Sequence, residues 1–60
     1  MDMYLAEMHR TVAGLREGAE RLKRAAQKFP ALRRNCERIL ASVRMLELHT
    51  SDLVEAKADD

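Results

Sequence analysis

A proline near the middle of the chain, Pro30, most constrains how this sequence can fold. Proline has no backbone N–H group, and it disfavours helical geometry in the residue before it, here Phe29. A long segment with apolar residues at helical spacing runs on each side of this point, and the spacing changes phase there. We therefore predict a first helix over about residues 3–27, a turn over about 28–30, a second helix over about 31–56 and a loose tail.

The first segment carries a heptad pattern, in which apolar residues recur at alternating intervals of four and three. The residues of this pattern are Leu5, Met8, Val12, Leu15, Ala19, Leu22, Ala26 and Phe29. Such a stripe is typical of a helix that packs against another helix, and we interpret it as core rather than as a cofactor site.

The second segment can be read in two phases. A shifted phase contains Leu32, Cys36, Ile39, Val43, Leu46, Thr50 and Leu53, whereas a phase continued from the first helix contains Arg33, Cys36, Leu40, Val43, Glu47, Thr50 and Val54. The continued phase would bury Arg33 and Glu47, which is costly. We therefore predict the shifted phase and an antiparallel hairpin; one long helix kinked at Pro30 is the alternative.

A register for this hairpin follows from pairing the two stripes, with facing residue numbers that sum to about 58. It places Met8 opposite Thr50 and His9 beside Glu47, and it makes one flank small and uncharged. The pairs along that flank are Thr11 with His49, Gly18 with Ser42, and Ala25 with Asn35. Exposed coiled-coil edges usually carry Glu and Lys, so we expect this flank to receive another helix.

A single domain of 60 residues is marginally stable unless a disulfide, a metal or assembly supports it. The single cysteine, Cys36, cannot form an internal disulfide, and no Cys/His cluster has zinc spacing, so we predict no metal and no cofactor. Assembly is the remaining support. We predict an all-α fold, an antiparallel helical hairpin that forms a four-helix bundle or packs on a helical partner.

The second helix has more apolar residues than one seam requires, which indicates a partner surface. The predicted partner-binding residues are Gly18, Leu40, Ala41, Ser42, Met45 and Leu48. The predicted function is therefore a non-enzymatic, coiled-coil-like protein–protein interaction module. It would oligomerise, or act as a small subunit or co-chaperone of a larger helical partner.

The net charge of +1 hides an asymmetry along the chain. Residues 16–44 carry nine basic and three acidic side chains, a net +6, whereas residues 1–15 carry −1 and residues 45–60 carry −4. In a hairpin the turn end is then basic and the open end acidic. This pattern favours an antiparallel homodimer with turns at opposite ends, and a hetero-complex with a larger helical protein is the competing prediction.

The basic turn also permits binding to nucleic acid, RNA in particular, by a dimeric bundle. The residues that would contact phosphates are Arg21, Arg24, Lys28, Arg33 and Arg34. Against this alternative, no aromatic residues are interleaved with them for base stacking.

Signals for catalysis or membrane insertion are missing from the sequence. There is no glycine-rich phosphate loop and no nucleophile elbow, and Cys36 falls on the apolar stripe, so we predict no enzyme. No apolar run approaches 18 residues and the N-terminus shows no signal-peptide pattern. We therefore predict a cytoplasmic protein with no membrane partner.

Overall fold

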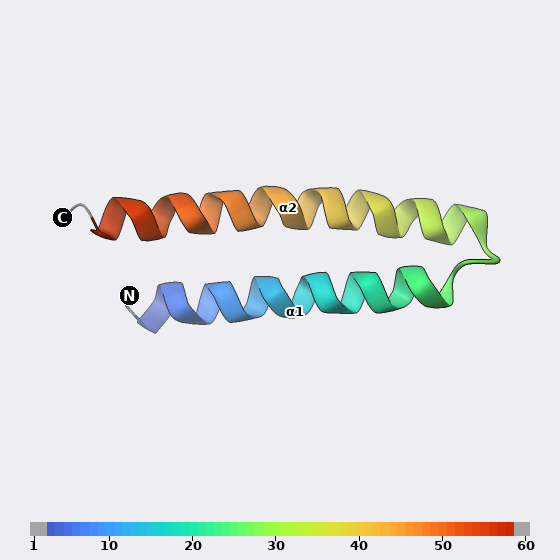
Figure 1. Cartoon of the computed structure of the whole chain (residues 1–60), viewed down its shortest axis with the longest axis horizontal. Coiled ribbons are helices and arrows are strands. Elements are labelled where there is room, and N and C mark those ends of the chain that lie inside the picture. The colour runs from blue at the N-terminus through green and yellow to red at the C-terminus, as the bar shows by residue number, and fades with distance from the viewer. Residues whose placement is uncertain (1–2, 59–60) are drawn as a thin grey trace.

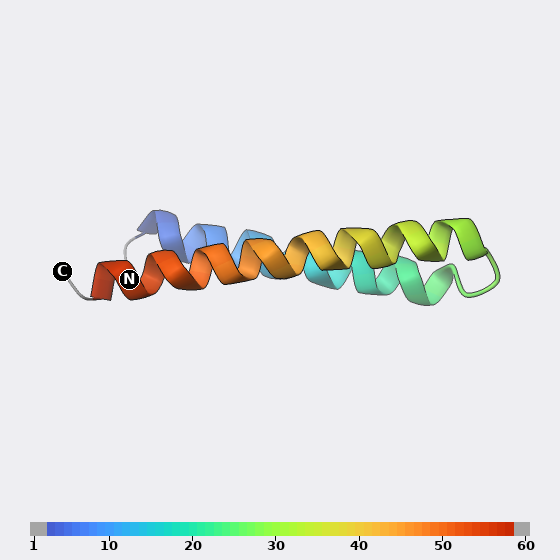
Figure 2. The same ribbon diagram turned by 90° about the horizontal axis from the view of Figure 1, so that it is seen from above.

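A computed structural model describes residues 3–58 as two packed helices, α1 (Met3–Ala25) and α2 (Pro30–Ala58). The helices run antiparallel, side by side along their length (Figure 1), and cross at a shallow angle (Figure 2). The all-α hairpin predicted from the sequence is confirmed, and the alternative of one kinked helix is wrong. Residues 59–60 of the predicted tail lie outside the described residues, and α2 includes positions 57–58.

The turn between the helices is built by backbone hydrogen bonds around Pro30. The Phe29 N–H group donates to the Ala26 carbonyl at 2.9 Å, which closes the turn. The Phe29 carbonyl then accepts from the Arg33 N–H group at 2.9 Å, so Phe29 caps α2 and Pro30 is its first helical residue. Proline suits this position, because the N–H group that it lacks would have no partner inside the helix.

The helices touch along a narrow seam of mostly small residues that recur every seven positions. The seam residues are Leu5, Val12 and Ala19 on α1, Ala26 directly after it, and Cys36, Val43 and Thr50 on α2; Val12 is half-buried and the others are buried. Thr50 is the one polar member, and its hydroxyl donates to the Leu46 carbonyl at 2.6 Å. Burial therefore leaves no unsatisfied polar group there.

The phase predicted for the second helix is wrong. Leu32, Ile39, Leu46 and Leu53 were expected in the core but are 42–49% exposed. The residues of the continued phase, Arg33, Leu40, Glu47 and Val54, are half-buried instead. The expected cost of burying Arg33 and Glu47 does not arise. Both side chains lie at the edge of the seam, and Glu47 is paired there with Arg16.

The glycines of α1 are not required for the approach of α2. A Cβ atom added at Gly14 or at Gly18 would meet no other atom within 4 Å. Neither glycine has a positive φ angle, so nothing in the hairpin itself opposes a larger residue at these positions.

We predict that Gly14→Ala stabilises the hairpin by about 0.4–1 kcal/mol, because alanine reduces the freedom of the unfolded chain at a helical position that is open. Urea unfolding followed by circular dichroism measures this change. A variant less stable than the wild type would show that another group occupies the space beside Gly14.

Candidate functional site: an uncharged face of the hairpin

Large apolar side chains line one side of the hairpin and remain uncovered. Within each helix they follow one another at intervals of seven residues, and each is 41–63% exposed. We call this row the apolar face; it consists of Met8, Leu15 and Leu22 on α1, Phe29 in the turn, and Leu32, Ile39, Leu46 and Leu53 on α2. Exposed apolar residues that are scattered need no explanation, but a contiguous row marks an interaction site.

Helical geometry places the whole row on one side of the seam. Leu15 and Arg16 lie on opposite flanks of the α1 seam residues, and Leu46 and Glu47 do so on α2. The side chain of Arg16 bonds to Glu47 across the two helices, so these two flanks share a side. The leucines therefore share the other side, the remaining helical members follow at intervals of seven, and Phe29 lies in the turn where the two rows end.

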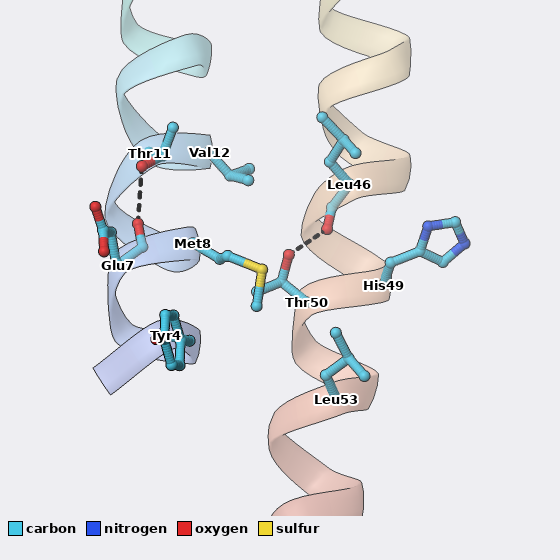
Figure 3. A pocket seen from close by; sticks show the side chains of 9 residues that line it. All are labelled: Tyr4, Glu7, Met8, Thr11, Val12, Leu46, His49, Thr50 and Leu53. Atoms are coloured by element: carbon cyan, nitrogen blue, oxygen red, sulfur yellow. Dashed lines mark hydrogen bonds between the residues drawn. The ribbon is translucent and has the colours of Figure 1, made fainter. Parts of the chain in front are cut away.

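A groove at the open end of the hairpin confirms that placement. It has a volume of about 360 Å³, and its walls are mostly apolar. The residues that line it are Tyr4, Glu7, Met8, Thr11, Val12, Leu46, His49, Thr50 and Leu53 (Figure 3). In Figure 3, Met8 reaches from α1 toward Thr50 of α2, the pair that the predicted register placed opposite each other.

The rows of residues that border the apolar face carry no charge. This rim consists of Tyr4, Thr11, Gly18 and Ala25 on α1 and Asn35, Ser42, His49 and Ala56 on α2. Face and rim together occupy sixteen positions without one Asp, Glu, Lys or Arg, although 35% of the chain is charged. A solvated helix surface normally carries such residues at these positions, so the composition fits a surface that becomes covered.

The opposite flank of the seam is polar and holds the two helices together. Arg16 donates from Nε to Glu47 Oε2 at 2.7 Å and from Nη2 to Glu47 Oε1 at 2.6 Å, and its Nη1 donates to Glu20 Oε1 at 3.2 Å. The Arg16 hydrogen bonds hold the pKa of Glu47 below its ordinary value and raise the pKa of Arg16. The predicted pair of His9 with Glu47 is wrong, because Arg16 takes both Glu47 oxygens.

The six predicted partner-binding residues do not form one surface. Gly18 and Ser42 belong to the rim, whereas Leu40 is half-buried on the polar flank. The remaining three lie on the side of α2 that faces away from α1; they are Ala41, Met45 and Leu48. Sequence reasoning missed the apolar face because it assigned those residues to the core, although it identified six of the eight rim residues as an uncharged flank.

Most of the residues predicted for nucleic-acid binding are accessible around the turn. Arg21, Arg24, Lys28 and Arg34 are exposed, and Arg33 is half-buried beside the seam. A shallow hollow of about 230 Å³ on α2 is lined by Arg34 and Arg38 together with Ala31 and Asn35.

Side chains that could bind a metal ion do not cluster in the described part of the chain. Over residues 3–58, no three His, Cys, Asp or Glu side chains gather in a way that could hold a metal ion. Cys36 is a free thiol with no exposed surface. Neither of the two described helices combines the length and apolar character needed to cross a membrane.

Comparison with protein-family models, curated proteins and solved structures finds no match to this chain.

We predict that the Arg16–Glu47 pair makes stability depend on pH. Because folding lowers the pKa of Glu47, its contribution is complete above the unfolded pKa and is lost as the pH falls through the folded pKa. Wild type should therefore exceed Glu47→Gln in stability at neutral pH, and the difference should vanish in acid. Urea unfolding across that range measures it.

Glu55→Gln, a substitution at an exposed position near the end of α2, is the control. A difference between wild type and Glu47→Gln that stays constant with pH would contradict the role of the pair.

Proposed function

We propose that this chain is a non-enzymatic association module that binds a helical partner through its apolar face. The observation that carries the proposal is the uncharged surface of sixteen positions, with large apolar residues in the centre and small or neutral ones at the rim. Recognition would be of the helix-in-groove kind, in which apolar side chains of a partner helix pack at helical spacing. The hairpin would act as a small cytoplasmic subunit.

The size of the face fits such a role. The hairpin measures 48 × 16 × 10 Å, and the apolar face runs along its long dimension. Stable protein interfaces bury roughly 800 Å² on each partner, which an elongated face of this outline can supply. An apolar row this long left in water would favour non-specific aggregation, so a specific partner explains it better than exposure does.

Association should therefore be required for a fully stable fold. We predict that the purified chain melts at a temperature that rises with its concentration, or that it is loosely folded until a partner is added. Sedimentation velocity and thermal melts followed by circular dichroism provide the measurement. A monomer that melts cooperatively, at one temperature over about a hundredfold range of concentration, would contradict the proposal.

Substitutions on two sides of the hairpin locate the contact. Leu15→Glu places a charge on the apolar face, and Leu48→Glu places one on the far side of α2, where the exposure is similar. We predict that Leu15→Glu weakens association by at least about 2 kcal/mol, because a buried charge loses its hydration, while Leu48→Glu has little effect. Equal effects of the two variants would argue against the apolar face.

Nucleic-acid binding is a second candidate, favoured by the net +6 on residues 16–44 and by the exposed arginines around the turn. We predict that any binding of RNA weakens steeply with salt, because phosphate contacts release counterions. The double variant Arg33→Ala, Arg34→Ala should reduce both the affinity and the salt dependence in a filter-binding assay. No retention of RNA by the wild type at low salt would remove this candidate.

A further inference from the structure

We infer that the occupant of the apolar face is a second copy of this chain, turned end for end, and that the groove at the open end receives Phe29 of that copy. This inference rests on the proposed function, and it names the partner, its orientation and one anchoring contact. Three features of the surface support it: the shape of the face, the charges beside it and the small residues at its middle.

The apolar face is complementary to itself when one copy is reversed. Its open end is hollowed into the groove between Met8 and Leu53, whereas at its other end Phe29 lies exposed in the turn. Phe29 is 63% exposed, the largest value among the eight residues of the face. If two faces pack with their turns at opposite ends, each Phe29 lies at the open end of the other copy, where the groove can take the ring. Buried aromatic anchors of this kind dominate interface energetics.

Charges just outside the rim select this orientation. They are Glu7 near the open end of α1, Arg21 near its other end, Lys28 in the turn, and Arg38 and Asp52 on α2, and all five are exposed. The two possible orientations of a face-to-face pair bring different members of this set together, as the next two cases show.

With turns at opposite ends, two-fold symmetry lays α1 over α1 of the second copy, and Glu7 comes level with Lys28 of that copy. With turns at the same end, α1 lies over α2 of the second copy instead. Glu7 then meets Asp52 and Arg21 meets Arg38, so both pairs repel. Exposed charge pairs add little affinity, but repulsion of this kind decides which way two surfaces dock.

Small residues occupy the middle of the rim, where the symmetry axis would pass. Gly18 lies about midway along the chain between Met8 at the groove and Phe29 at the turn, and Ser42 lies midway between Asn35 and His49. A Cβ atom at Gly18 has open space in the single hairpin, so the absence of a side chain there serves no contact within the chain. In the symmetric pair the axis brings each of these residues close to its own counterpart. Small residues at that point allow the helices of the two copies to approach closely.

Disulfide trapping tests the orientation, with Cys36→Ala as the common background so that no other thiol reacts. When the turns are at opposite ends, Asn35 of α2 lies beside His49 of the second copy. When the turns are at the same end, Asn35 lies beside Ala25 instead. We expect a mixture of Asn35→Cys and His49→Cys variants to oxidise to a linked heterodimer, and a mixture of Asn35→Cys and Ala25→Cys variants to give none. Linkage in the second mixture but not in the first would overturn the orientation.

Substitution of the anchor tests the groove. We expect Phe29→Ala to raise the dimer dissociation constant at least about tenfold, and Phe29→Leu to raise it less. The control Leu48→Ala, on the side of α2 that faces away from α1 and from the apolar face, should leave the constant unchanged. Sedimentation equilibrium measures the constants, and circular dichroism at high concentration verifies that each variant is helical. A Phe29→Ala dimer as tight as wild type would overturn the anchoring contact.

The state of the wild-type chain alone separates this inference from the proposed function. A dimer supports both. A chain that stays monomeric and loosely folded at high concentration overturns the second copy as occupant but leaves the association module with a different partner. A cooperative monomer whose melting temperature is independent of concentration overturns both.

Discussion

The contact between α1 and α2 runs through one narrow row of residues on each helix, and this contact determines what the remaining surface can be. The members of the row are mostly small, such as Ala19, Ala26 and Cys36. When the central row is small, the large side chains at the neighbouring heptad positions cannot point into the contact. They lie at its edges, half in water. The hairpin thus uses its small residues to close on itself and leaves its large ones at one side.

The two edges of the seam differ because an ion pair crosses only one of them. Arg16 donates hydrogen bonds to both oxygens of Glu47 in a bidentate arrangement, which fixes the relative position of the helices along their length. The pair remains about one-third exposed, so water still solvates it and its burial is inexpensive. The charged side chains beside the seam lie on this edge, and none lies on the apolar face or its rim. The apolar face is therefore a consequence of where the charges were placed, as much as of where the leucines were.

The hairpin was predictable because the signals for its helices and turn lie close together in the sequence. Which edge of the helix contact is charged and which is apolar depends on contacts between residues far apart in the sequence. Pro30 and the heptad spacing indicate two helices and a turn, and the structure has both. The phase of α2 was wrong because Arg33 and Glu47 were treated as fully buried, whereas a residue at the edge of a two-helix contact keeps its charged tip in water. Nothing along the chain shows that Arg16, 31 residues away, reaches Glu47. The uncharged row of Thr11, Gly18 and Ala25 was visible, and it identified half of the surface that the structure reveals.

Under the proposed association, the division of residues between seam and face would couple folding to association. The buried core of the described hairpin contains only five apolar residues, and two of them are alanines. Burial of apolar area contributes about 25 cal/mol per Å², so a core this small offsets little of the conformational entropy lost by more than fifty ordered residues. The eight side chains of the apolar face hold more apolar surface than the seam does, and only another molecule can cover it. Under the proposed association, covering the face would add hydrophobic free energy to that of the seam, so a partner would stabilise the fold itself and would not merely bind to a finished one.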